Sequence, residues 1–242
     1  MDDKSDPKSV PAAPRTAEVD AFLRQVATMP AARPARGGRG RLIFAMDATA
    51  SREPTWDRAC GIQGEMFEAT AALGGLDVQL VFYRGFNECK ASKWMTAAPA
   101  LHRAMRAVFC IGGQTQIARV LGHAIAVARD GGQVNALVFV GDAMEESLDE
   151  LLGLAGELGL LNVPCFVFHE GGNPVAARAF KEIARVTRGA YCPFDAGSAE
   201  QLRALLGAVA AFAAGGRRAL ADYGKRTGGA ALLLTRQLGG AT

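Results

Sequence analysis

The sequence has few of the residues that build soft-metal or dithiol sites. It contains three histidines and five cysteines in 242 residues, and no two cysteines form a CxxC pair. Zinc knuckles and dithiol redox centres depend on such pairs, so neither is indicated. The cysteines are odd in number, widely spaced and mostly in apolar surroundings, which is typical of buried, reduced thiols.

A strong charge and a long apolar run are also lacking. The formal net charge is only +3, which argues against a nucleic-acid-binding protein. The longest apolar run, 202–214, is interrupted by Arg203 and is too short to span a bilayer. The first residues contain no apolar segment of the kind found in signal peptides. We therefore expect a cytoplasmic protein that binds neither nucleic acid nor membrane.

Apolar runs alternate with helical patterns along most of the chain, and half of its residues are hydrophobic. Continuous apolar strands separated by amphipathic helices indicate a parallel sheet covered on both faces. The sequence therefore predicts a doubly wound, Rossmann-like α/β domain with a mainly parallel central sheet flanked by helices on both faces. The expected strands are 42–46, 77–83, 135–140, 163–168 and 190–194, with a short edge strand within 87–95. The expected helices are 54–73, 99–109, 115–129, 146–161, 173–188 and 198–214.

Composition divides the chain into three parts. Residues 1–40 combine a start rich in Asp, Lys, Ser and Pro with one short helical pattern and a Pro/Gly/Arg linker, so we predict mostly disorder there. Residues 41–214 form the α/β domain, and 215–242 form a basic tail that can add another helix. The glycine cluster of the linker precedes the first strand. A phosphate-binding loop must follow a strand, so no nucleotide site is indicated.

Polar side chains follow the predicted strands and open a predicted helix. Asp47, Thr49 and Ser51 come after the first strand, Thr115 follows two glycines, and Asp142 follows the strand 135–140. The carboxyl ends of parallel strands meet at one edge of such a sheet, where ligands bind. Carboxylates and hydroxyls are hard oxygen donors that suit Mg²⁺ and suit zinc poorly.

These residues resemble the metal-ion-dependent adhesion site of the von Willebrand factor A (VWA) domain family. That site combines a D-x-S-x-S motif after the first strand, a threonine in a later glycine-rich loop and an aspartate after the fourth strand. The matching positions here are Asp47, Thr49, Ser51, Thr115 and Asp142. The resemblance implies that the three hydroxyls contact Mg²⁺ directly and that the two carboxylates act partly through water. Mn²⁺ or Ca²⁺ can take the same place.

The resemblance further implies a non-enzymatic domain that docks a protein partner, which contributes an acidic side chain to the metal. Two positions depart from the family pattern: Thr49 replaces the more usual serine, and Ala143 stands where glycine is common. Glu145 and the neighbouring Glu146 add negative charge next to the site. We predict that Glu145 and His169 lie on the partner-binding rim.

Three alternatives stay open on the sequence alone. A haloacid dehalogenase-like phosphohydrolase also begins with a strand ending in aspartate. It needs a second acid where Thr49 stands and a lysine before the last motif, and no lysine lies between Thr115 and Asp142. A metal-free interaction scaffold is the second alternative. The third is purely structural, because Asp, Ser and Thr at strand-to-helix turns often only cap the next helix.

Overall fold

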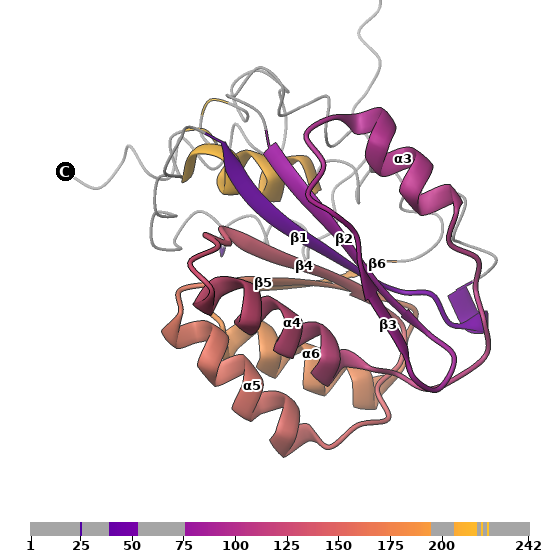
Figure 1. The fold of residues 1–242 in the computed structure, drawn as a ribbon. Coiled ribbons are helices and arrows are strands. Elements are labelled where there is room, and N and C mark those ends of the chain that lie inside the picture. Colours follow the sequence, from indigo (N-terminus) through magenta and orange to yellow (C-terminus); the bar gives the residue numbers. More distant parts are fainter. Residues whose placement is uncertain are drawn as a thin grey trace, which may run out of the picture.

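The computed structural model describes residues 39–52, 76–194 and 206–216, together with Gln25, Ala219 and Asp222. This part of the chain forms one central sheet with helices on both of its faces (Figure 1). The predicted doubly wound, mainly parallel α/β architecture is confirmed.

Within the described residues, the sheet has six strands in the order β3-β2-β1-β4-β5-β6. Every neighbouring pair is parallel except β2 and β3, which are antiparallel. The central strands β1, β4 and β5 are almost wholly buried, as expected for strands covered on both faces. The strand bounds are β1 Gly40–Asp47, β2 Leu76–Arg84, β3 Glu88–Ala91, β4 Ala136–Gly141, β5 Cys165–Glu170 and β6 Ala190–Phe194.

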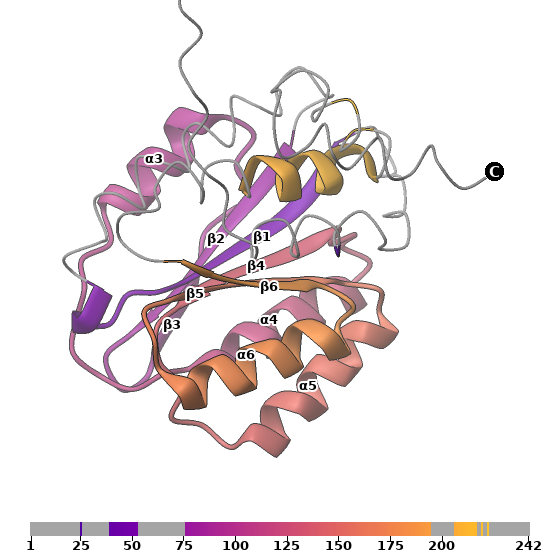
Figure 2. The same ribbon diagram turned by 180° about the vertical axis from the view of Figure 1, so that it is seen from behind.

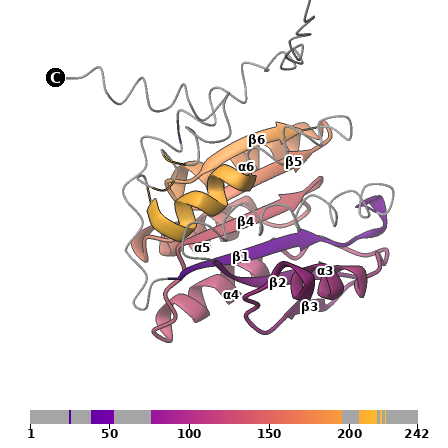
Figure 3. The same cartoon turned by 90° about the horizontal axis from the view of Figure 1, so that it is seen from above.

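The helices form two separate layers. α4, α5 and α6 cover one face of the sheet, and α3 lies on the opposite face with the helix over 206–216 (Figures 1 and 2). Figure 3 shows these layers from above. Each layer has its own apolar core, because alternate side chains of β1 point to opposite faces: Phe44 packs toward the α3 side and Ile43 toward the α4 side. The bounds are η1 Ala50–Arg52, α3 Ala98–Arg106, α4 Ile117–Arg129, α5 Leu148–Leu160 and α6 Pro174–Val186.

The predicted elements that fall within the described residues agree with the structure to within about three residues at their ends. The short edge strand predicted within 87–95 is β3, and Asn173 caps α6 as its sequence position suggests, accepting hydrogen bonds from the N–H groups of Val175 and Ala176. α4 begins at Ile117 rather than at Thr115, because Thr115 and Gln116 still belong to the preceding loop.

Several predictions fall outside the described residues. These are the N-terminal helix and linker, the helix 54–73, the start of the helix 198–214 and most of the basic tail. The three-part division of the chain therefore stays a prediction. Within the described ranges, no helix is both long and apolar enough to cross a membrane.

Candidate functional site

The candidate site lies where the winding of the sheet reverses. From β1 the chain proceeds to β2 on one side, and it later returns to place β4 on the other side of β1. Such a topological switch point leaves a crevice outside the carboxyl ends of the two strands. Asp47 ends β1, and Asp142 directly follows β4. Two of the predicted site residues therefore flank the switch point.

Asp47 is fully buried and held from two sides. Its Oδ1 accepts a hydrogen bond from the Thr49 N–H at 2.7 Å, and its Oδ2 accepts one from the Tyr83 hydroxyl at 3.0 Å. Burial raises the pKa of the Asp47 carboxyl, the two hydrogen-bonding residues oppose this shift, and the nearby charge of Asp142 adds to it. The carboxylate is thus fixed in place and close to a second one.

The turn after β1 presents two hydroxyl groups. Thr49 is buried, Ser51 is exposed, and their oxygens Oγ1 and Oγ lie 3.1 Å apart. The short η1 turn keeps them together, since the Arg52 N–H donates to the Thr49 carbonyl at 3.0 Å. The structure therefore brings Asp47, Thr49 and Ser51 into one small turn, as the D-x-T-x-S spacing predicts.

Thr115 is clamped to the loop that follows β4. Its N–H donates to Oε2 of Glu145 at 3.1 Å, and its Oγ1 accepts from the Glu145 N–H at 3.0 Å. This reciprocal pair joins the glycine-rich loop to the segment carrying Asp142. Thr115 is also not the cap of α4, because the helix begins two residues later. Glu145 is thus exposed, but its carboxylate is engaged in a hydrogen bond within the protein.

Glu146 takes over the capping of α4. The N-cap residue of this helix, Gln116, makes no side-chain capping hydrogen bond. The carboxylate of Glu146 instead accepts hydrogen bonds from the N–H groups of Ile117 at 2.6 Å and Ala118 at 2.8 Å. A negative charge at a helix N-terminus is favourable because the exposed N–H groups carry partial positive charge. The Glu146 carboxylate is thus held at the N-terminus of α4.

Replacing Glu146 with glutamine is expected to lower the free energy of unfolding by about 1–2 kcal/mol, since a charged hydrogen-bond acceptor at a helix terminus is lost. Denaturant unfolding measures the change. The control is Glu182→Gln, which removes an exposed ion pair with Arg185 on α6 and should change stability by less than about 0.5 kcal/mol. Equal effects of the two substitutions would contradict the capping role of Glu146.

Asp142 has an unused oxygen. Its Oδ1 is buried and has no hydrogen-bond partner in the part of the chain that the structure describes. A buried carboxylate oxygen left without a partner carries a desolvation cost. Such an atom is a natural place for a cation or a bound water.

Two charged residues at this edge were not among the predicted site residues. Arg52 is only 1% exposed, and its guanidinium forms an ion pair with Glu170 at the end of β5. Arginine is almost never buried so completely unless its charge is paired. The sequence signal was the arginine directly after Ser51, together with the acid that ends the strand at Glu170.

His169 is not on the rim, and this prediction is wrong. The residue is only 1% exposed, and its Nδ1 lies 2.9 Å from the Tyr191 hydroxyl of β6. It packs edge-on against the ring of Phe180 in α6, with ring centroids 5.2 Å apart. Burial lowers the pKa of His169. The cause is the alternation of β5, which turns His169 toward the helix layer.

The donor set fits a hard divalent cation. Asp47 and Asp142 offer carboxylate oxygens, and Thr49, Ser51 and Thr115 offer hydroxyl oxygens with free lone pairs. Among the described residues, no cluster of three or more His, Cys, Asp or Glu side chains is suited to a metal ion. A cation at this edge therefore depends on the hydroxyls for part of its coordination.

Exposed apolar side chains surround the same edge. The loop carrying Phe109 and Ile111 is joined to the β1 end, since the Ile111 N–H donates to the Ala48 carbonyl at 3.0 Å. Phe109 is 62% exposed and Phe86, in the β2–β3 turn, is 69% exposed. The guanidinium of Arg84 lies 4.2 Å from the centroid of the Phe109 ring. Exposed apolar side chains gathered at one edge of a domain are typical of protein-binding surfaces.

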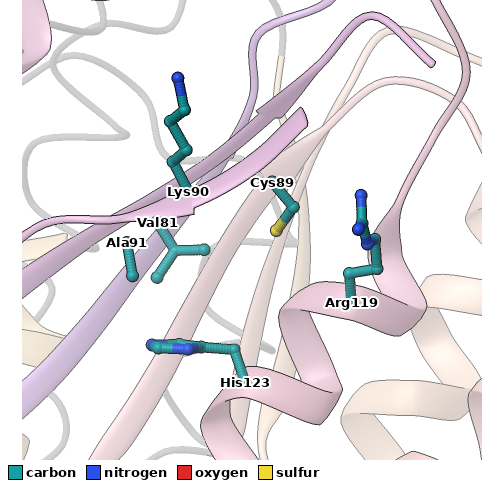
Figure 4. A pocket seen from close by; sticks show the side chains of 6 residues that line it. All are labelled: Val81, Cys89, Lys90, Ala91, Arg119 and His123. Atoms are coloured by element: carbon teal, nitrogen blue, oxygen red, sulfur yellow. The ribbon is translucent and has the colours of Figure 1, made fainter. Parts of the chain in front are cut away.

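A separate hollow lies between β3 and α4, with a volume of about 330 Å³. Figure 4 shows the side chains of Cys89 and His123 directed into it, whereas Lys90 points away. Nε2 of His123 is 2.9 Å from Oε1 of Gln79. None of the predicted site residues lines this hollow, whose lining is Val81, Cys89, Lys90, Ala91, Arg119 and His123.

Comparison with known proteins shows similarity in fold rather than in sequence. No family model and no curated protein sequence matches the chain. A von Willebrand factor type A protein from Catenulispora acidiphila superposes with a TM-score of 0.59 at 14% identity, covering 72% of this chain and 43% of that one. BatB from Bacteroides thetaiotaomicron gives a TM-score of 0.56 at 12% identity, covering 69% and 96%.

The VWA domain of SpRpn10 gives a TM-score of 0.54 at 12% identity, covering 69% of this chain and 94% of that domain. The chain thus spans less than half of the Catenulispora protein but nearly all of two smaller neighbours. Its described part has the fold of von Willebrand factor A domains.

Proposed function

We propose that this protein is a divalent-cation-dependent protein-binding domain, which docks a partner through a cation held at the switch point of the sheet. The observation that carries the proposal is the buried Oδ1 of Asp142, which lacks a hydrogen-bond partner among the described residues. It lies close enough to Asp47 for the charge of one to raise the pKa of the other. Two neighbouring carboxylates repel each other, and a cation between them removes that cost.

The residues of such a site would have different roles. Asp47 and Asp142 supply negative charge, and Tyr83 and the Thr49 N–H hold Asp47 in one orientation. Thr115 is fixed by Glu145 across the loop. When bound, Mg²⁺ would offer a Lewis-acidic position to an oxygen ligand of the partner.

A protein partner is supported by the exposed apolar side chains at the same edge. Phe86, Phe109 and Ile111 would add apolar contact area around an acidic side chain that approaches the cation. The fold shared with VWA domains agrees with this proposal. On this proposal, the protein is an adaptor and carries out no reaction itself.

Isothermal titration with Mn²⁺ and Mg²⁺ tests the metal site. Wild type should bind one ion, and Asp142→Asn and Asp47→Ala should each lower the affinity at least about tenfold, since a carboxylate charge is lost from a partly buried site. The control is Asp130→Asn, which neutralises an exposed carboxyl at the C-terminus of α4 and should leave binding unchanged.

Other outcomes would favour the alternatives. Binding that is equal in wild type and Asp47→Ala, or absent in both, would reject the metal-dependent function. A partner retained equally well with EDTA and by Thr115→Ala would indicate a metal-free scaffold. Turnover of a phosphate ester that depends on Asp47 would indicate a phosphohydrolase.

A further inference from the structure

Arg52 brings a positive charge to the switch point, and this charge opposes a metal ion. It directly follows the D-x-T-x-S turn, yet its long side chain is only 1% exposed. Arginine keeps its proton even when buried, because its ordinary pKa lies far above neutrality. The candidate site therefore contains a permanent positive charge of its own.

The strand register places this charge beside three carboxylates. Met46 pairs with Val140, so the end of β1 lies level with the end of β4. Gly141 pairs with His169, so the residues that follow, Asp142 and Glu170, also lie at adjacent strand positions. The ion pair of Arg52 with Glu170 thus brings the guanidinium to the row of strand ends that carries Asp47 and Asp142.

The electrostatics agree with this geometry. Burial lowers the pKa of Arg52, whereas the negative charges of Asp142 and Asp47 act in the opposite direction. Two acids on different strands therefore interact with the guanidinium besides Glu170. A buried charge is tolerated only when such partners compensate for its lost hydration.

We infer that Arg52 is a built-in counter-cation, which stabilises the carboxylates of the site when no metal is bound and weakens the binding of a divalent cation. Glu170 offsets part of the Arg52 charge and so limits this competition. The inference rests on the proposed metal site, and it concerns what sets the affinity of that site. A site of this kind holds its shape without metal and binds the ion only weakly.

The inference predicts opposite effects for the two members of the ion pair. In Arg52→Gln, three carboxylates remain with no buried cation beside them, so a divalent cation is attracted more strongly. In Glu170→Gln, the full charge of Arg52 acts on Asp47 and Asp142, so the cation is attracted less. A purely structural ion pair would behave differently, because loss of either member would disturb the site and weaken binding in both cases.

Mn²⁺ titration of four proteins forms the test: wild type, Arg52→Gln, Glu170→Gln and the double variant. We expect at least about a tenfold gain in affinity for Arg52→Gln and at least about a tenfold loss for Glu170→Gln, given unit charges within several ångströms in a partly buried site. The double variant should fall between the two. Arg52→Lys, which keeps the charge, should lie closer to wild type than Arg52→Gln does.

Thermal unfolding provides a second measurement on the same proteins. Without metal, Arg52→Gln should unfold at a lower temperature than wild type, and Mn²⁺ should raise its midpoint by more than it raises that of wild type. If Arg52→Gln does not fold, the loss of affinity in Glu170→Gln and its recovery in the double variant still test the inference. Shifts of the same sign for both single variants would overturn it.

The outcomes also separate this inference from the proposed function. If wild type binds no Mn²⁺ but Arg52→Gln does, the inference is supported and metal-dependent docking by the natural protein is rejected. If wild type binds Mn²⁺ through Asp142 and both ion-pair variants bind equally well, the proposed function stands and the inference is overturned. Absence of binding in every variant overturns both.

Discussion

Replacing Gly113 with alanine is expected to displace the loop that carries Thr115 and to lower the free energy of unfolding by about 1–3 kcal/mol. A Cβ atom at this position would lie 2.0 Å from the carbonyl oxygen of Gly85 and 2.2 Å from its carbonyl carbon. Both are backbone atoms of the β2–β3 turn, so they have no side-chain rotamer with which to move aside. The two loops must therefore separate.

That separation would break contacts that position the candidate site. The Gly85 carbonyl accepts hydrogen bonds from the Gln114 N–H at 3.1 Å and from the Gln116 side chain at 3.2 Å. Alanine gains about 0.4–1 kcal/mol over glycine by restricting the unfolded chain, which is less than the steric cost. We expect Mn²⁺ affinity to fall together with stability, because Thr115 lies only two residues further on.

Gly112→Ala is the matched control for this prediction. It changes the neighbouring glycine of the same loop, but a Cβ atom there would meet only the Ala50 Cβ, at 3.9 Å, which is an ordinary contact. Denaturant unfolding and amide hydrogen exchange at residues 114–118 are the measurements. Faster exchange in Gly113→Ala but not in Gly112→Ala is expected, and indistinguishable behaviour of the two would contradict the close approach to Gly85.

Phe139→Ala is expected to destabilise the protein by about 3–5 kcal/mol, since it removes a large side chain from a close-packed core. The ring is 2% exposed and packs edge-on against Phe180 of α6, with centroids 5.4 Å apart. On its other side it lies near the ring of Tyr83, at 6.4 Å. The melting temperature should fall by roughly 10 °C.

This core ring also supports the site above it. A Cβ atom on Gly141 would lie 2.8 Å from the Phe139 ring, so the ring occupies the space directly beneath the residue that precedes Asp142. Its loss would loosen Tyr83, whose hydroxyl holds Asp47. Phe86→Ala, on an exposed phenylalanine of the β2–β3 turn, should change stability by less than about 0.5 kcal/mol. Similar melting temperatures for the two variants would show that Phe139 is not a core residue.

The fold could be predicted largely from local sequence patterns. The run 42–46 is apolar throughout, and a strand with that pattern must be buried on both faces, which is how β1 lies in the structure. Asn173 and Pro174 identify the start of α6 through capping chemistry that acts within a few residues. No such local signal marks the start of α4, because its capping carboxylate comes from the distant Glu146.

Only part of the candidate site could be read in the same way. Asp47, Thr49 and Ser51 share one turn, so their spacing alone brings them together. Thr115 and Asp142 were placed at the same edge by the rule that parallel strands align their carboxyl ends. The clamp between Thr115 and Glu145 does not follow from spacing, because it depends on which way each side chain turns. Alternation along β5 turns His169 toward the helix layer, but its burial there depends on Phe180 of α6 and Tyr191 of β6.

By itself the sequence determined the alternation of strands and helices, the parallel sheet and the row of oxygen donors at its edge, because each depends on local periodicity or on a general rule of sheet topology. Tertiary structure alone decided that Arg52 turns inward to Glu170. An arginine after a polar turn is ordinarily solvated, and its burial is favourable here only because carboxylates from β1, β4 and β5 meet at one place. The order of the strands in the sheet brings these carboxylates together, and no short stretch of sequence specifies that order.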